Sequence, residues 1–169
     1  MKIAVTGHTS GIGKAIYDYF APDNSVIGFS RGNGYDINNP DDRARILQQS
    51  LDSDIFVNNA SLGDSQLAIL KLVFSAWENT DKLIINISSR YTTDPESIYC
   101  IRKKELDNFC EQNTFNRPLI INLKPGLTDT PRVLDKPGQK MSTDRIIEIL
   151  DYALKSRSVL KIHSITFGL

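Results

Sequence analysis

Cysteines are scarce in this sequence, neither charge is in excess, and no long hydrophobic run occurs. Only Cys100 and Cys110 are present in 169 residues. They fall ten residues apart in one predicted helix, too far for a disulfide, so we expect reduced thiols and a cytoplasmic protein. Twenty basic and twenty acidic side chains cancel, so we expect no nucleic acid partner and no membrane association. No apolar stretch approaches the length that spans a bilayer.

The rest of the composition is that of a compact globular protein. Hydrophobic residues make up 40% of the chain and charged residues 24%, which is enough to bury a sizeable core. We therefore predict a single domain over residues 1–169. An apolar strand begins at Lys2, and we expect no secretory signal before it.

Short apolar runs alternate with segments of helical periodicity along the whole chain. The predicted strands are residues 3–5, 25–29, 54–57, 83–87, 119–123 and 159–167, and the predicted helices are 14–20, 40–51, 65–79, 96–112 and 143–154. This alternation predicts an α/β protein, a three-layer Rossmann fold with a mostly parallel sheet of roughly six to seven strands. Residues 32–37 are too few for a crossover helix. If a further strand, third in the chain, lies near residues 32–37, we therefore expect the helix between strands two and three to be missing, and this third strand to be a stub or to be reached by a loop.

Three glycines separate the first strand from the first helix. The segment reads Thr6-Gly7-His8-Thr9-Ser10-Gly11-Ile12-Gly13. Glycine lets such a turn close and lets a phosphate approach the backbone, and free N–H groups at a helix start attract an anion. The spacing Gly-x-x-x-Gly-x-Gly differs from the dinucleotide fingerprint Gly-x-Gly-x-x-Gly. We predict that residues 7–13 bind the phosphates of a nucleotide cofactor.

Ser30 and Arg31 end the second strand, where a nucleotide-binding fold meets the adenosine ribose. An acidic side chain at this point binds the 2′-hydroxyl of NAD, whereas an arginine binds a 2′-phosphate. The sequence therefore favours NADP over NAD, and a solvated loop charge is the alternative for Arg31. Asp36 is a candidate for binding the adenine edge, or it begins a turn that leads to Pro40.

Tyr99 and Lys103 lie four residues apart in a predicted helix, so their side chains share one face. A phenol has a pKa of about 10 in water, and a neighbouring fixed cation favours the phenolate. Tyr99 is therefore a candidate proton carrier at neutral pH. The alternative is a chance spacing, with a half-buried tyrosine beside a solvated lysine.

Polar residues follow two of the predicted buried strands at their carboxyl ends. These are Asn58-Asn59-Ala60 and Ser88-Ser89. Ligands bind at this edge of open α/β sheets, so both segments are candidate parts of a site.

The predicted helix 65–79 is apolar on more than one face. An apolar stripe of this width exceeds what packing on a sheet requires. We therefore predict a homodimer, formed through this helix and the helix that carries Tyr99.

In this order, the motifs resemble the short-chain dehydrogenase/reductase family over nearly the whole chain. They are Thr6-Gly7-x-x-x-Gly11-x-Gly13, Asn58-Asn59-Ala60, Ser89, Tyr99-x-x-x-Lys103 and Pro125-Gly126-x-x-x-Thr130. The resemblance implies that Tyr99 is the catalytic acid/base, and that Lys103 lowers its pKa and binds the nicotinamide ribose. Ser89 would hold the substrate oxygen, with Ser88 as the alternate serine. The other implied cofactor-binding residues are Asn58, Asn59, Ala60, Pro125, Gly126, Leu127 and Thr130.

The resemblance implies an NADP-dependent oxidoreductase that transfers hydride between the nicotinamide and a small carbonyl or alcohol, without a metal site. The alternative is a catalytically weak NADP-binding sensor or regulator on the same fold. A nucleotide-sugar epimerase is disfavoured, because no C-terminal substrate domain follows. The family's catalytic asparagine has no clear match, and Ser65 or Gln66 stands near its place. The segment after Thr130 is short, so we expect a shallow, open pocket.

Overall fold

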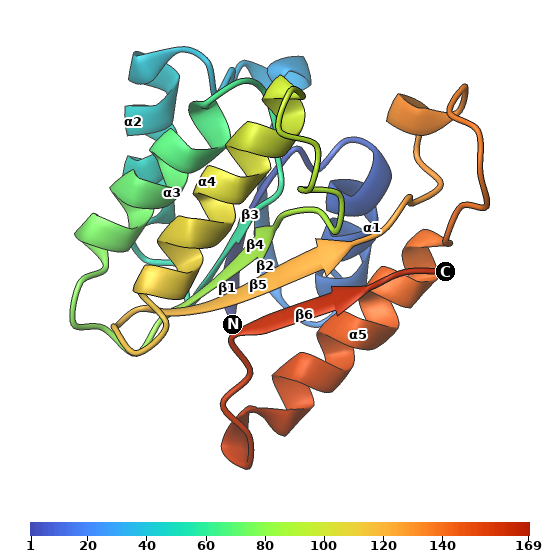
Figure 1. Cartoon of the computed structure of the whole chain (residues 1–169). Coiled ribbons are helices and arrows are strands. Elements are labelled where there is room, and N and C mark those ends of the chain that lie inside the picture. Colours follow the sequence, from blue (N-terminus) through green and yellow to red (C-terminus); the bar gives the residue numbers. More distant parts are fainter.

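The computed structural model describes residues 1–169, in which one sheet lies between two layers of helices (Figure 1). Six strands form the sheet in the order β2-β1-β3-β4-β5-β6. They are β1 (Lys2–Thr6), β2 (Ser25–Phe29), β3 (Ile55–Asn58), β4 (Leu83–Ile87), β5 (Leu119–Pro125) and β6 (Ser164–Phe167). The predicted Rossmann fold is confirmed, and every strand pair is parallel.

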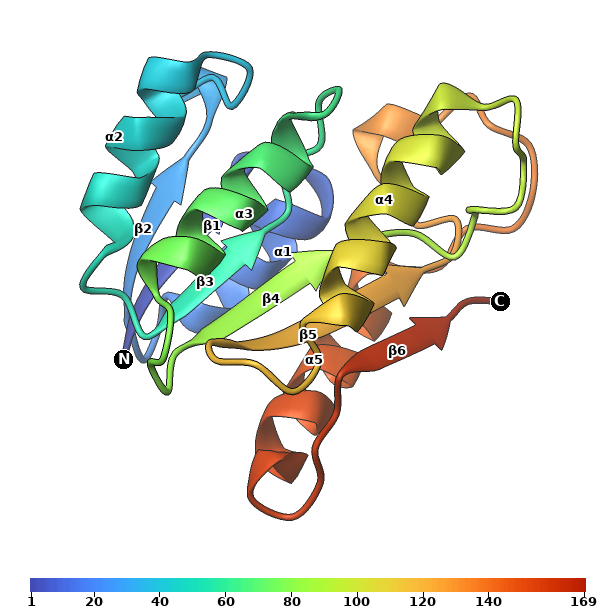
Figure 2. The same cartoon turned by 60° about the vertical axis from the view of Figure 1, so that its left-hand side comes forward.

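Two helices cover one face of the sheet and three cover the other (Figure 2). α1 (Gly11–Phe20) and α5 (Thr143–Lys155) share one face, and α2 (Pro40–Ser50), α3 (Ser65–Ala76) and α4 (Ile98–Gln112) share the other. Alternate strand residues point to opposite faces, so Ile3 joins the core under α1 and α5 while Ala4 joins the core under the other three. β3 and β4 are buried along their whole length, which is why they read as continuous apolar runs.

Side-chain caps fix where three of the helices begin. Asn39 accepts a hydrogen bond from Asp41 N at the start of α2, directly before a proline in the first turn. Ser97 caps α4 and Ser142 caps α5 in the same way. In a parallel sheet with crossover helices, these N-termini lie at the edge formed by the carboxyl ends of the strands. That edge is where the site residues collect.

The prediction of a third strand directly after β2 is wrong, because no strand forms over residues 32–37. Residues Arg31–Asn33 form one turn of 3₁₀ helix, and residues 35–39 pair with no strand. Side chains satisfy this backbone instead: Asp42 Oδ2 accepts from Asp36 N at 3.0 Å, and Asp36 Oδ1 accepts from Asn38 N at 2.9 Å. The chain therefore turns directly into α2 and leaves β2 at the edge of the sheet.

Several other boundaries differ from the prediction; α1, for example, begins at Gly11 and not at residue 14. α3 ends at Ala76, because Trp77 turns into the core and Asn79 adopts a positive φ of 61°. The last strand begins at Ser164 and not at residue 159, because residues Ser156–Ser158 add a 3₁₀ turn to α5 and Val159 is 82% exposed.

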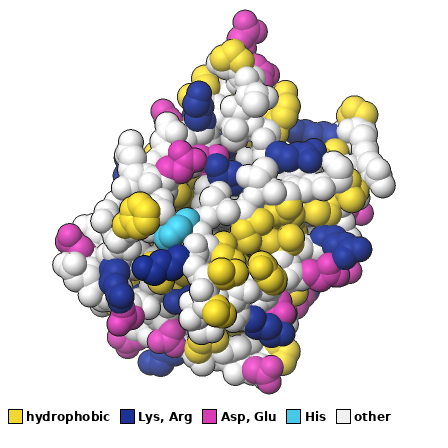
Figure 3. Space-filling view, turned by 60° about the horizontal axis from the view of Figure 1, so that its bottom comes forward, with side chains coloured by type: hydrophobic (Ala, Val, Ile, Leu, Met, Phe, Trp, Pro, Cys, Tyr) yellow, Lys and Arg dark blue, Asp and Glu magenta, His cyan; other side chains and the backbone are white.

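The surface carries no continuous patch of one charge on the face drawn in Figure 3, where basic and acidic side chains are interspersed. No helix combines the length and the apolar character needed to cross a membrane. Both cysteines are free and buried.

Candidate active site

Close backbone packing holds the glycine turn between β1 and α1. Gly7 and Gly11 have positive φ angles of 71° and 54°, a region that other residues rarely adopt. A Cβ atom on Gly13 would lie 2.2 Å from the carbonyl oxygen of Gly7. Glycine at this position therefore allows α1 to begin directly against the end of β1.

Thr6 joins this turn to the loop after β3 through hydrogen bonds. Its Oγ1 accepts hydrogen bonds from the backbone N–H groups of Asn59 at 3.0 Å and Ala60 at 3.1 Å, and it donates to the Val57 carbonyl at 3.1 Å. Asn59 Nδ2 donates back to the Thr6 carbonyl at 3.1 Å. The fold thus brings the predicted residues Asn59 and Ala60 together with the glycine turn.

The start of α1 offers free hydrogen-bond donors. Ser10 makes no side-chain cap, and the first turn holds no acidic residue. The first N–H groups of the helix therefore have no partner within the helix, and a pyrophosphate fits such a place. Thr9 and Ser10 are exposed beside them, whereas His8 packs against the ring of Tyr17 at a centroid distance of 5.2 Å.

The end of β2 presents one free cation. Arg31 is exposed and makes no side-chain hydrogen bond or ion pair. Ser30 caps the 3₁₀ turn with Asn33, whose Oδ1 accepts from Ser30 N at 2.7 Å. The carboxylate of Asp36 accepts from Asn38 N at 2.9 Å, as the turn alternative for this residue describes.

Lys103 is a buried lysine held by Gln66 of α3. Its Nζ donates to Gln66 Oε1 at 2.8 Å and to the Ile87 carbonyl at 3.0 Å. Gln66 Nε2 in turn donates to the carbonyls of Ile87 and Asn58. Burial, together with the positive charge of Arg132, lowers the pKa of Lys103 to about 7. Burial therefore works against the fixed positive charge that the sequence predicts beside Tyr99.

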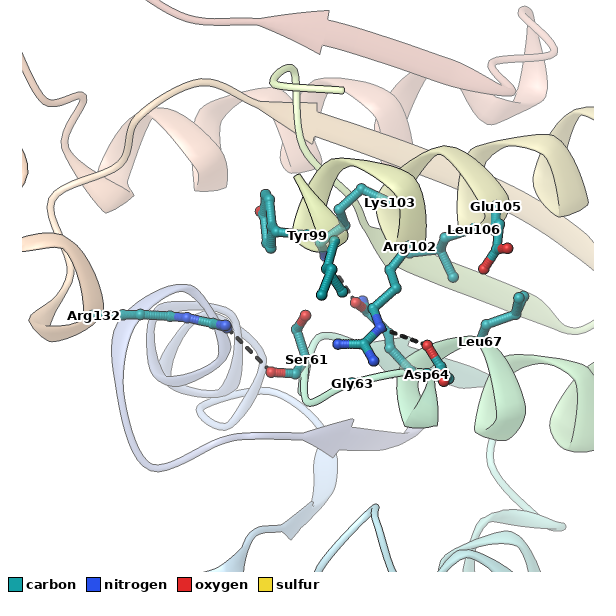
Figure 4. A pocket seen from close by; sticks show the side chains of 12 residues that line it. Ser61, Gly63, Asp64, Leu67, Tyr99, Arg102, Lys103, Glu105, Leu106 and Arg132 are labelled. Atoms are coloured by element: carbon teal, nitrogen blue, oxygen red, sulfur yellow. Dashed lines mark hydrogen bonds and ion pairs between the residues drawn. The ribbon is translucent and has the colours of Figure 1, made fainter. Parts of the chain in front are cut away.

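Tyr99 and Lys103 line one cavity of about 320 Å³ between the first turns of α3 and α4 (Figure 4). Tyr99 is 40% exposed, and Lys103 Nζ lies 5.8 Å from the centroid of its ring. The two side chains share one face, while the ammonium group points to Gln66. The other lining residues are Ser61, Gly63, Asp64, Gln66, Leu67, Ile98, Arg102, Glu105, Leu106 and Arg132.

Ser88 and Ser89 follow β4 and lie outside this cavity. Ser89 Oγ accepts a hydrogen bond from Tyr91 N at 3.0 Å, which leaves its own O–H free to donate. Ser88 Oγ is buried and has no hydrogen-bond partner. Of the two serines, Ser89 has the hydroxyl that is oriented by a neighbour.

A row of three buried asparagines crosses the sheet beneath the site. Asn58, Asn86 and Asn122 occupy paired positions on β3, β4 and β5. Asn58 Nδ2 donates to Asn86 Oδ1, and Asn86 Nδ2 donates to Asn122 Oδ1, both at 2.8 Å. The row continues to Asp107 of α4, which pairs with Lys124 at 3.2 Å. The side chain of Asn58, a predicted cofactor residue, is 0% exposed and belongs to this row.

The loop after β5 returns to the glycine turn. Pro125 ends the strand, and Gly126 N donates to the Phe167 carbonyl at 2.7 Å. Leu127 accepts from Met141 N at 2.8 Å. The Cγ2 atom of Thr130 lies 3.1 Å from the place that a Cβ on Gly11 would occupy. The fold therefore brings Thr130 against the predicted phosphate turn.

Four charged residues of the cavity are missed by the sequence analysis, namely Asp64, Arg102, Glu105 and Arg132. Arg102 Nε pairs with Asp64 Oδ1 at 2.6 Å, and Arg132 Nη1 donates to the Ser61 carbonyl at 3.1 Å. The only signals in the sequence are that Arg102 is next to Lys103 and that Arg132 is two residues after Thr130.

Gln66 and Ser65 are the two candidates near the place of the missing asparagine, and Gln66 is the one that bonds Lys103. Ser65 instead donates to Asn38 Oδ1 at 2.6 Å. No three histidine, cysteine, aspartate or glutamate side chains gather into a set that could hold a metal ion.

Comparison with known proteins gives structural likeness alone. No family model and no curated protein matches the sequence. The 3-alpha-hydroxysteroid dehydrogenase from Pseudomonas sp., solved with NADH, has a TM-score of 0.83 at 18% identity. The match covers 99% of this chain and 94% of the dehydrogenase chain. A short chain dehydrogenase from Burkholderia cenocepacia, solved with NADP, has a TM-score of 0.81 at 18% identity, covering 99% and 88%. For 4-hydroxyisoleucine dehydrogenase, solved with NADH, the TM-score is 0.79 at 19% identity, covering 99% and 96%. The chain therefore has the fold of the short-chain dehydrogenases/reductases, as the order of its motifs predicts.

Proposed function

We propose that the protein is an NADP-dependent oxidoreductase that interconverts a small carbonyl compound and its alcohol, with Tyr99 as the acid/base. The observation that carries this proposal is the shared cavity of Tyr99 and the buried Lys103, at the same edge of the sheet as the uncapped start of α1. The solved structures with this fold that hold NADH or NADP support a nicotinamide cofactor.

A bound nicotinamide supplies or accepts the hydride. In the reducing direction, the Tyr99 hydroxyl donates its proton to the substrate oxygen, and the resulting phenolate is reprotonated from solvent through the open side of the cavity. Lys103 in its charged form stabilises that phenolate. Ser89, which follows β4 outside the lining of this cavity, would donate a hydrogen bond to a substrate oxygen that extends beyond the cavity toward β4. The residues expected to hold the cofactor phosphates are those of the glycine turn, and Thr130 and Gly126 would lie over its nicotinamide end.

The activity is tested by following NADPH consumption with a panel of aldehydes, ketones and oxo acids. We expect saturable turnover of at least one class, and the reverse reaction with the matching alcohol and NADP. Tight NADPH binding without turnover of any class would contradict the proposal and favour the alternative of an NADP-binding sensor.

The preference for NADP rests on Arg31, which is exposed at the end of β2 and has no partner within the chain. Hydrogen bonds from a guanidinium to a phosphate are charge-assisted. Fluorescence titration should therefore show that Arg31→Gln weakens NADPH binding by about 10- to 100-fold and leaves NADH binding nearly unchanged. Equal losses for both cofactors would refute the assignment of Arg31 to the 2′-phosphate.

We also propose a homodimer through α3 and α4. Leu72, Ile98 and Ile101 are 40%, 61% and 44% exposed on these helices, and the Phe74 and Phe109 rings pack edge to face between them at 5.5 Å. Analytical ultracentrifugation at micromolar concentration should give a dimer, and a monomer would reject this interface.

A further inference from the structure

The cavity beside Tyr99 has a reactive end and a remote end (Figure 4). Glu105 lies with Leu67 and Leu106 at the remote end, away from Tyr99 and Arg132. In the middle, Asp64 is neutralised by Arg102, because their atoms lie 2.6 Å apart. No carboxylate remains free at the end that holds Tyr99.

Arg132 is the cation at that reactive end without an acidic partner. Its one hydrogen bond runs from Nη1 to the Ser61 carbonyl at 3.1 Å, and the ion pairs of this cavity do not include it. A guanidinium has five N–H donors in one plane, so most of those of Arg132, an exposed residue that lines the cavity, have no partner in the chain. Its charge reaches Lys103, whose pKa it helps to lower.

The backbone adds to this positive field. α3 begins at Ser65 and α4 at Ile98, and residues of both first turns line the cavity. Helix N-termini carry partial positive charge from their unpaired N–H groups. At α3 this charge is uncapped, because the Asp64 carboxylate makes no capping hydrogen bond and pairs with Arg102 instead.

We propose that the substrate carries a carboxylate in addition to its reacting carbonyl or alcohol group, and that Arg132 binds this carboxylate. The inference rests on the proposed function and names its substrate class. A carboxylate matches the planar fork of an arginine with two parallel hydrogen bonds. The volume of about 320 Å³ is at the small end of ligand sites, which fits a short oxo acid.

The carboxylate takes no part in the bond changes. One hydride from the nicotinamide adds to the carbonyl carbon, and one proton from Tyr99 adds to its oxygen, which gives the hydroxy acid. Arg132 is a specificity-determining residue that orients the substrate between the phenol and the hydride donor.

Matched acids and esters test the proposal. Steady-state rates are measured with NADPH for pyruvate and acetoacetate against methyl pyruvate and methyl acetoacetate. We expect kcat/KM for the acids to exceed that for the esters by about 10-fold or more. Arg132→Gln should raise KM for the acids by about 10- to 100-fold and leave the esters unchanged, with Arg132→Lys between the two. Arg145→Gln, on the exposed surface of α5, is the control and should alter KM neither for the acids nor for the esters.

The outcomes separate this inference from the proposed function. Reduction of esters and acids with equal kcat/KM, or an equal loss for both in Arg132→Gln, would overturn the role of Arg132 while the oxidoreductase stands. If no compound is reduced, the proposed function fails, and calorimetric titration of the NADP-loaded protein with acetoacetate decides the carboxylate site. Binding that is lost in Arg132→Gln supports the site, and no binding to the wild type rejects it.

Discussion

The glycine turn and the cavity beside Tyr99 lie at the same edge of the sheet. The turn is built mainly from backbone groups, whereas the cavity is lined by side chains. Around the turn, the contacts are backbone groups, the Thr6 hydroxyl and the Asn59 amide, joined by hydrogen bonds such as Asn59 N to Thr6 Oγ1 at 3.0 Å. The cavity is built from long charged side chains, of which Lys103 titrates near neutral pH. The first region is fixed by backbone conformation, close packing and hydrogen bonds, whereas the second depends on protonation and on side chains that come from other elements.

The largest effect is expected where a side chain would break the first region. Gly13→Ala places a methyl group 2.2 Å from the Gly7 carbonyl oxygen, so the start of α1 must shift away from β1. We expect urea denaturation to show a loss of about 3 kcal/mol in the free energy of unfolding, together with weaker NADPH binding.

The control for this change is Gly32→Ala, where the nearest atom to the added methyl group lies 3.6 Å away. This variant should stay within about 0.5 kcal/mol of the wild type. A Gly13→Ala protein as stable as the control would show that the turn is not held as tightly as these distances indicate.

In the second region, Gln66→Leu removes the amide that joins Lys103 to the carbonyls of Ile87 and Asn58. Because these buried partners lose hydrogen bonds, the free energy of unfolding should fall by about 2 to 3 kcal/mol. Ser65→Ala removes a single half-buried hydrogen bond to Asn38 and should cost about 1 kcal/mol. If urea denaturation shows that Gln66→Leu and Ser65→Ala lower the free energy of unfolding equally, the special role of Gln66 is refuted.

The smallest effect is a pH dependence. Because the native pKa of Lys103, about 7, lies below that of an exposed lysine, the unfolded state binds more protons above neutral pH. This residue therefore makes the stability rise with pH, by about 1.4 kcal/mol per pH unit. The effect amounts to about 2 kcal/mol between about pH 7 and about pH 8.5.

Lys103→Met should remove this slope and be most stabilising, relative to the wild type, at the acidic end of the range. Burial raises the pKa of Cys110 to about 12, so that thiol stays protonated in the native state and adds no rise. Lys104→Met, at the exposed neighbouring position, should keep the slope of the wild type. An unchanged slope in Lys103→Met would contradict the buried, readily deprotonated lysine.

The same contrast explains how far the sequence could predict this protein. The glycine turn, the alternation of elements and the Tyr99-Lys103 spacing are local patterns, and each forms as predicted. The missing third strand is not predictable in detail, because side chains of Asp36 and Asp42 replace the strand pairing.

The charged residues of the cavity are also beyond local pattern. Arg132 belongs to a 3₁₀ turn over Pro131–Val133 and Asp64 precedes α3, and both meet α4 only in the folded chain. Nothing in their neighbours' types marks them. The depressed pKa of Lys103 depends on burial beneath Gln66, 37 residues earlier in the chain. Helical spacing predicts which side chains share a face, but not which of them lose contact with water.

The most direct test of the account is the hydroxyl of Tyr99. With the carbonyl compound that is reduced fastest, Tyr99→Phe should lower kcat by about 1,000-fold or more, while the dissociation constant for NADPH changes by less than about twofold. Tyr152→Phe, on the exposed surface of α5, controls for the loss of a phenol elsewhere and should retain full activity. Turnover retained in Tyr99→Phe would contradict the central claim that this phenol carries the proton.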